Sequence, residues 1–173
     1  MNIEDLTGKG DKGLQLVTFR LGEENYGIPV WKVKEIIRPM KAYPIPGMAK
    51  PVEGVINLRG EIIPVLMIHS VLGIPESVEQ NDSRKKRIII LDSGDGGFGF
   101  VVDEVMDVAK VNPEDIKKSP EVNADRLCRD AMLGIVQVAG RMIICIDPGK
   151  LVAECLNVRE LMSECGSVDM AAC

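Results

Sequence analysis

Residues 54–68 read Gly-Val-Ile-Asn-Leu-Arg-Gly-Glu-Ile-Ile-Pro-Val-Leu-Met-Ile, which places two apolar runs on either side of a short polar turn. This pattern predicts a β-hairpin, because Asn57 and Gly60 can supply the geometry of a tight reversal and β-branched residues resume at Ile62. After the turn both alternating faces are apolar, which predicts a strand covered on two sides. Pro64 cannot donate a ladder hydrogen bond and indicates an edge or a bulge. A closed barrel packed against a second element and a parallel sheet under helices both fit, and Pro64 argues against the centre of a parallel sheet.

The same order of residues returns at 134–146, where a glycine again begins an apolar run and a second glycine, six residues on, marks the turn. An earlier pair of segments, Tyr26-Gly27-Ile28 and Phe98-Gly99-Phe100, is separated by 72 residues, whereas the two hairpins are separated by 80. We therefore predict an internal duplication with an eight-residue insertion in the second copy. The alternative is that any two β-rich segments with glycine turns look alike.

Further strands are expected on both sides of these motifs. Residues 15–21 and 26–28 predict a first hairpin, and residues 88–91 and 98–102 predict its counterpart. Between prolines 29 and 39, apolar residues at helical spacing predict a short helix or helical turn; they are Val30, Val33, Ile36 and Ile37.

Two more helical segments are expected in the second half. Asn112-Pro113-Glu114-Asp115 has the cap, the proline and the acidic first turn of a helix start. Residues 148–163 carry an apolar stripe that predicts an amphipathic C-terminal helix. The tails, residues 1–13 and 164–173, are predicted to be flexible.

The net charge of −5 argues against nucleic acid as a partner, because no general phosphate-binding footprint is present. The one basic cluster, residues 84–87, is interpreted as a solvated linker in preference to a nucleic-acid patch. No signal peptide and no apolar run of roughly 18 residues is found, so a cytoplasmic protein without direct membrane insertion is expected.

The thiols and the single histidine do not form a catalytic or metal-binding pattern. The cysteines are odd in number and contain no Cys-x-x-Cys pair, which predicts neither a disulfide framework nor a zinc site; they are Cys128, Cys145, Cys155, Cys165 and Cys173. Cys145 and Cys155 are interpreted as small apolar core residues. His69 is interpreted as structural, and without a second histidine no Cys-His or Ser-His nucleophile can be built. No metal, no cofactor and no enzymatic activity are expected.

One glycine-rich segment allows an alternative function. Gly94, Gly96 and Gly99 match the spacing of a dinucleotide-binding loop, which would make the chain a small nucleotide-binding enzyme. That reading requires a following helix whose N-terminus meets the pyrophosphate. Because the residues that follow are typical of a strand, a plain β-turn is favoured.

Taken together, these motifs resemble the chemotaxis coupling protein family CheW from about Leu14 to Val158. The resemblance rests on Tyr26-Gly27-Ile28, on the Val-x-x-Val-x-Glu-Ile segment from Val30, on the proline-rich loop, and on residues 54–65. Residues 101–105 and 135–146 extend it through the second half. Where the family commonly has Asp-Leu-Arg, this chain has Met67-Ile68-His69.

The resemblance implies a mainly β fold of two packed five-stranded SH3-like barrels, which agrees with the duplication. The first barrel is expected at residues 14–80 and the second at 84–147, with strands that can be exchanged between them. It also implies an adaptor that binds the regulatory domain of the histidine kinase CheA and the cytoplasmic tip of a methyl-accepting chemoreceptor. Such an adaptor would be recruited to receptor arrays at the inner face of the membrane. A receiver-linked or kinase-embedded relative of the same fold is the alternative, and the separate adaptor is favoured because the 173 residues contain no phosphoacceptor aspartate domain and no kinase segment.

Carried over residue by residue, the resemblance implies two sets of contact residues. The receptor-facing set is Val33, Glu35, Ile36, Arg38, Arg59 and Val105. The kinase-facing set is Ile45, Pro46, Lys117 and Val122.

Each receptor-facing residue also has an interpretation without a partner. Val33, Ile36 and Val105 can be core residues, and Glu35 can be a solvated charge. Arg59 can orient the hairpin, or it can pair a carboxylate bidentately, either across an interface or within the fold.

Overall fold

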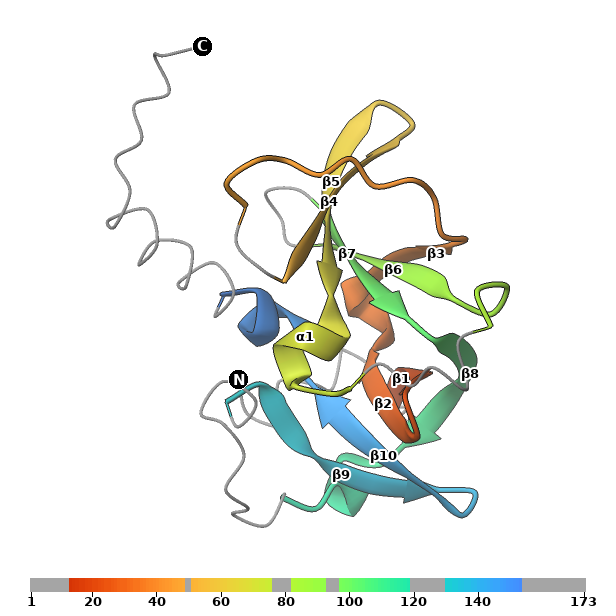
Figure 1. The fold of residues 1–173 in the computed structure, drawn as a ribbon. Helices are drawn as coiled ribbons and strands as arrows, with labels where there is room; N and C mark the ends of the chain where they lie inside the picture. The colour runs from red at the N-terminus through yellow and green to blue at the C-terminus, as the bar shows by residue number, and fades with distance from the viewer. Residues whose placement is uncertain (1–12, 49–50, 76–81, 93–96, 119–129, 154–173) are drawn as a thin grey trace.

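The computed structural model describes residues 13–48, 51–75, 82–92, 97–118 and 130–153. Within them the chain is mainly β, with two five-stranded sheets and a few short helices (Figure 1). The first sheet contains, in order, β8 (Glu104–Val111), β1 (Leu14–Leu21), β2 (Glu24–Pro29), β10 (Arg141–Ile146) and β9 (Met132–Val138). The second sheet contains β3 (Val33–Ile37), β6 (Arg87–Asp92), β7 (Gly97–Val102), β5 (Glu61–Met67) and β4 (Val52–Leu58). The helical segments are α1 (Ile68–Leu72), the 3-10 turns η2 (Val30–Lys32) and η4 (Pro113–Asp115), and residues 148–153.

Both sheets are assembled from the two halves of the chain. In the first sheet β2 lies parallel to β10, and in the second sheet β5 lies parallel to β7. Every other strand pair is antiparallel among the described residues. The predicted mainly β fold with two five-stranded SH3-like units is confirmed.

The chain passes from one sheet to the other at two points that the duplication relates. The first passage is η2, between β2 and β3, and the second is the single residue Asp103, between β7 and β8. These two positions lie at the 72-residue spacing that was found between the earlier segments. Neither sheet can be completed by a contiguous half of the chain.

The two hairpins have the same backbone geometry. Arg59 and Gly60 have φ values of 52° and 90°, and Ala139 and Gly140 have φ values of 49° and 78°. Positive φ at both central residues is the type I′ geometry that suits a two-residue hairpin turn. Asn57 supports the first turn from outside, since its Oδ1 accepts a hydrogen bond from the Gly60 N–H at 2.9 Å. The β4–β5 and β9–β10 tips lie at opposite ends of the molecule (Figure 1).

A glycine at the start of each hairpin allows another chain segment to approach closely. Gly54 has a φ of 156°, and a Cβ added there would lie 2.5 Å from the Tyr43 carbonyl oxygen. Gly134 has a φ of 153°, and its Cβ would lie 2.6 Å from the Lys117 carbonyl oxygen. The approaching segments form isolated bridges, Tyr43 with Val55 and Lys117 with Ile135. This repeated geometry supports the predicted duplication.

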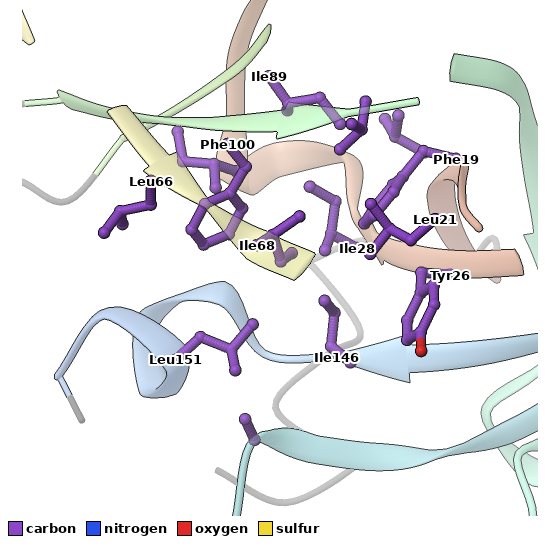
Figure 2. Close-up of a cluster of buried hydrophobic side chains, with 14 of the residues drawn as sticks. Phe19, Leu21, Tyr26, Ile28, Leu66, Ile68, Ile89, Phe100, Ile146 and Leu151 are labelled. Atoms are coloured by element: carbon purple, nitrogen blue, oxygen red, sulfur yellow. The ribbon is translucent and has the colours of Figure 1, made fainter. Parts of the chain in front are cut away.

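The largest apolar cluster lies between the two sheets. Side chains from β1 and β2 meet side chains from β5, β6 and β7, and Leu151 and Ile146 complete the cluster (Figure 2). We call this cluster the shared core; the residues labelled in the figure are Phe19, Leu21, Tyr26, Ile28, Leu66, Ile68, Ile89, Phe100, Ile146 and Leu151. Each sheet also has a smaller apolar cluster of its own. The cluster of the first sheet includes Leu16 and Cys145, and that of the second sheet includes Ile56 and Val65. Cys145 is a buried core residue, as predicted, and burial raises the pKa of its thiol to about 12.

Three sequence expectations about local structure were wrong. The apolar residues after Pro29 form only the 3-10 turn η2, and Val33–Ile37 is strand β3, paired with β6. Their β-branched side chains suit a strand, and the pairing with β6 outweighs the helical spacing. The proline after Asn112 begins only the 3-10 turn η4, without a side-chain cap to the backbone. Ile62 is 63% exposed, so the beginning of β5 is not covered on both faces.

Several expectations fall outside the described residues. They include both flexible tails apart from Gly13, the loop over residues 119–130 that is expected to carry the insertion, apart from Asp130, and Cys155. The predicted C-terminal helix is described only over residues 148–153, where buried Asp147 accepts a hydrogen bond from the Gly149 N–H at 2.9 Å.

Replacement of Gly54 or Gly134 by alanine is expected to lower the free energy of unfolding by about 2–4 kcal/mol, because the new Cβ would meet backbone and the positive φ would be strained. Gly47→Ala is the matched control. Its φ is 81°, but no atom of the described residues lies within 4 Å of the Cβ position, so only about 1 kcal/mol of conformational strain is expected. Urea unfolding measures all three variants. Equal losses for Gly54→Ala and Gly47→Ala would contradict the close approach.

Candidate protein-binding surfaces

A bidentate ion pair joins β3 to the turn of the β4–β5 hairpin. Arg59 NH1 donates to Glu35 Oε1 at 2.8 Å, and NH2 donates to Oε2 at 3.1 Å. The Arg59 side chain is 74% exposed and that of Glu35 is 25% exposed. A second pair, Lys34 Nζ to Glu61 Oε2 at 3.1 Å, joins the same strand to the start of β5. Because β3 and β4 are the two edges of the second sheet, these contacts bridge the open side of the barrel.

The pair changes the titration of Glu35 and fixes the direction of its side chain. The hydrogen bonds from Arg59 hold the pKa of the Glu35 carboxyl below its usual range. Glu35 is therefore a paired carboxylate, and Arg59 pairs with it within the fold. The Arg59 guanidinium remains mostly accessible to a partner.

Aliphatic residues and one further arginine lie on or beside the strand that carries Glu35. Ile36 is 40% exposed, and Arg38 is exposed at the end of the strand. Val33 is half-buried and packs against the shared core. We group these residues of β3 and the hairpin turn as a candidate surface, which we call the β3 surface; it contains Val33, Glu35, Ile36, Arg38 and Arg59.

Val105 comes from the other sheet. It lies on β8 opposite Phe19 of β1, and it packs against the same shared core as Val33. The structure therefore relates Val105 to the β3 surface through the core, whereas sequence comparison related the two valines only by duplication.

The duplicated strand β8 has a charged pair of its own, which the sequence analysis missed. Arg141 NH2 lies 3.0 Å from Asp107 Oδ2, and this contact joins β8 to the β9–β10 hairpin. Hydrogen bonds from Thr18, and then from Arg141, lower the pKa of Asp107. Asp107 follows Glu35 by the same 72 residues, so the duplication was the available signal.

The predicted kinase-facing residues lie at two separate places. Ile45 is 44% exposed and Pro46 is exposed, both on the loop whose Tyr43 bridges to β4. Lys117 bridges to β9, at the hairpin that Figure 1 places at the other end of the molecule. Val122 lies outside the described residues.

Lys117 lines an open pocket of about 580 Å³. The pocket combines two lysines with the exposed Met142, which is 61% exposed, and its lining residues are Asp115, Lys117, Lys118, Ile135, Gln137 and Met142. Positive charge beside exposed apolar surface suits an acidic, partly apolar protein segment.

The structure does not supply the helix that the glycine-rich alternative requires. Residues 93–96 lie outside the described part, and Gly97 begins strand β7 directly. The described side chains contain no group of three or more His, Cys, Asp or Glu residues placed to hold a metal ion. In the part of the chain that the structure covers, no helix has the length and apolarity needed to cross a membrane.

Comparison with known proteins agrees with the sequence motifs and the fold. The family model described as the CheW-like domain matches residues 15–155. The chain belongs to the CheW family.

Individual members of the family show how far the similarity extends. The chemotaxis protein CheW of Treponema pallidum is 36% identical over 142 residues, which is 82% of this chain and 83% of the relative. The CheW protein of Thermotoga maritima is 30% identical over 149 residues, covering 86% and 93% of the two chains. The crystal structure of a scaffolding CheW protein from Thermoanaerobacter tengcongensis superposes with a TM-score of 0.72 at 31% identity, covering 83% of this chain and 90% of that one.

Family membership confirms the predicted resemblance and the prediction that the chain is a chemotaxis scaffold and not an enzyme.

The carboxyl of Glu35 is expected to titrate below the usual range of a glutamate, because Arg59 stabilises its ionised form. The ion pair is then fully formed above the usual glutamate pKa and is lost as the pH falls through the lowered value. Side-chain NMR measures this titration. Arg59→Ala should return the Glu35 pKa toward the usual range, and Arg84→Ala, which removes an exposed arginine paired with Asp82, should leave it unchanged. An unchanged Glu35 titration in Arg59→Ala would contradict the pairing.

Proposed function

We propose that this chain is a cytoplasmic adaptor that couples the cytoplasmic tip of a methyl-accepting chemoreceptor to the regulatory domain of the histidine kinase CheA. Bound to both, it would place kinase autophosphorylation under receptor control. The observation that carries the proposal is the β3 surface, in which the accessible guanidinium of a bidentate ion pair lies beside the strand that carries the exposed Ile36. Recruitment to receptor arrays at the inner face of the membrane follows from this role and requires no insertion into the bilayer.

The β3 surface suits a helical partner for a physical reason. A helix presents side chains at spacings of three and four residues, and such a partner can place apolar anchors against Val33 and Ile36. Charged groups at the edge of an interface set orientation and register more than affinity. Arg59 and Glu35 provide both signs of charge within one contact, with Arg38 beside them. Val105 contributes at the rim of the shared core.

A separate surface is available for the kinase. The pocket beside Lys117 lies at the β9–β10 hairpin, whereas Ile45 and Pro46 lie beside β4. A standard interface buries about 800 Å² on each partner, so two partners can bind this chain at the same time. Weak contacts that repeat in an array would act through avidity.

Kinase autophosphorylation with CheA and a receptor fragment tests the coupling. The wild-type chain is expected to raise autophosphorylation only when the receptor fragment is present, and Arg59→Ala and Ile36→Asp are each expected to reduce this effect about tenfold. Ile36 is a better test position than Val33, because Val33 packs against the shared core and its replacement by aspartate would also destabilise the fold.

Arg84→Ala is the matched control for Arg59→Ala. Arg84 is also an exposed arginine with a bidentate carboxylate partner, since its Nε and NH2 lie 3.0 and 3.2 Å from the Asp82 oxygens. It is expected to retain full coupling. If the wild-type chain binds neither protein and leaves kinase activity unchanged, the proposed function is wrong.

Substitutions in the pocket are expected to separate the two partners. Lys117→Glu and Met142→Asp should each weaken binding of the kinase regulatory domain about tenfold and leave receptor binding unchanged. Lys110→Glu, at an exposed lysine of β8 outside the pocket lining, is the control. Isothermal titration with each partner measures the effect. A loss of receptor binding with intact kinase binding would assign the pocket to the receptor.

A further inference from the structure

Asp103 stands where the chain passes from the second sheet to the first. Its N–H donates to the carbonyl oxygen of Arg20 at 3.1 Å. Its Oδ2 accepts a hydrogen bond from the Gly22 N–H at 2.7 Å and lies 3.0 Å from Nε2 of His69. One side chain therefore ties the β1–β2 turn to helix α1, and α1 directly follows β5.

The contact between His69 and Asp103 is buried. The His69 side chain is 4% exposed and that of Asp103 is 15% exposed. Nδ1 of His69 is buried and has no hydrogen-bond partner among the described residues, so Nε2 makes the only hydrogen bond described for the ring. Because an ionised carboxylate only accepts, Nε2 must carry the hydrogen. A break in this bond would leave the buried His69 ring without a hydrogen-bond partner among the described residues, and this cost favours the bonded arrangement.

No other side chain of the described residues substitutes for His69 at Asp103. Arg20, whose carbonyl oxygen accepts from the Asp103 N–H, places its NH2 3.1 Å from Oε2 of Glu104, the residue after Asp103. Lys85 also lies toward Glu104, at 3.7 Å. Both cations are thus directed to the next carboxylate, and among the described side chains His69 is the one that joins the Asp103 carboxylate to helix α1.

The hydrogen bond between His69 and Asp103 lies between two parts of the proposed receptor surface, and these two parts belong to different sheets. Val105 follows Asp103 by two residues on β8. Arg59 lies in the hairpin whose second strand, β5, leads into α1 and His69. Ile68, which precedes His69, is fully buried in the shared core, against which Val33 and Val105 both pack.

We propose that His69 is a positioning residue of the receptor-binding surface. Through its hydrogen bond to Asp103, it holds the start of β8 with Val105 in a fixed relation to the hairpin that carries Arg59. The inference rests on the proposed function, because it concerns the geometry in which the receptor tip is bound. His69 itself touches no partner.

Binding of a receptor-tip fragment to His69 variants tests this inference. Trp31 is the only tryptophan of the chain and lies in η2, two residues before Val33, so its fluorescence can report binding. His69→Leu, which removes the donor, is expected to weaken binding about tenfold, a usual size for coupling between sites. His69→Gln places an amide N–H near the position of Nε2 and is expected to restore affinity to within about twofold of the wild type. Asn112→Ala, which removes an exposed side-chain contact to Asp115, is expected to have no effect.

The hydrogen on Nε2 gives a second and independent measurement. Imidazole ¹⁵N spectra of the single histidine are expected to show hydrogen on Nε2 in the folded protein. A spectrum with Nδ1 alone protonated would overturn the inference, and this result can be obtained even if His69→Leu does not fold.

The outcomes distinguish the inference from the proposed function. If the wild-type chain binds the fragment and folded His69→Leu binds it equally well, the positioning role is wrong while the function stands. If His69→Gln binds as weakly as His69→Leu, the hydrogen bond is not the cause and the inference is overturned. If the wild-type chain does not bind the fragment, the proposed function fails and the inference fails with it.

Discussion

The shared core between the two sheets is the constraint on which the rest of the structure depends. Each sheet contains strands from both halves of the chain, held by the parallel pairs of β2 with β10 and of β5 with β7. Neither barrel can therefore be completed by its own half, and apolar surface from both sheets is removed from water in one cluster. Because the shared core joins the two sheets, the candidate surfaces near Arg59 and near Lys117 belong to a single folded unit. An adaptor needs this property, because the position of one bound partner then fixes the position of the other.

Both barrels carry a charged pair across the open edge, although the duplication relates only the two carboxylates, Glu35 and Asp107. In each sheet the two edge strands lie across an open side, and a charged pair bridges that side, Glu35 with Arg59 in one barrel and Asp107 with Arg141 in the other. Exposed ion pairs contribute little to stability, so their main effect is to direct side chains and to hold the hairpin near the edge strand. Short bridging segments at Tyr43 and Lys117 cover the outer edges of β4 and β9. In the barrel that contains β3 and β4, the Arg59 guanidinium of the ion pair stays accessible, and β3 also carries the exposed Ile36. A partner can therefore contact the residues that close this barrel.

Local patterns in the sequence predicted most of the fold, but not the partners of the strands. The hairpins follow from alternating apolar residues and glycine turns, and the family motifs indicated the two SH3-like units. The exchange of strands depends on contacts between residues far apart in the chain, such as Gly27 with Cys145, and no local pattern encodes them. The helical spacing of the apolar residues after Pro29 led to a wrong prediction, because these residues are β-branched and those from Val33 on form an edge strand instead. The sequence allowed Arg59 to pair a carboxylate within the fold or across an interface, but it did not identify Glu35 as the partner. The contact of His69 with Asp103 was not predicted, since it joins two turns whose approach depends on the shared core.

Sedimentation analysis of a mixture of the chain, a receptor-tip fragment and the kinase regulatory domain tests the central claim most directly, namely that one body binds two partners at separate surfaces. The account predicts a complex that contains all three proteins, and it predicts that saturation with either partner leaves the affinity for the other within about threefold. Mutual exclusion of the two partners, with only binary complexes at saturating concentrations, would contradict it.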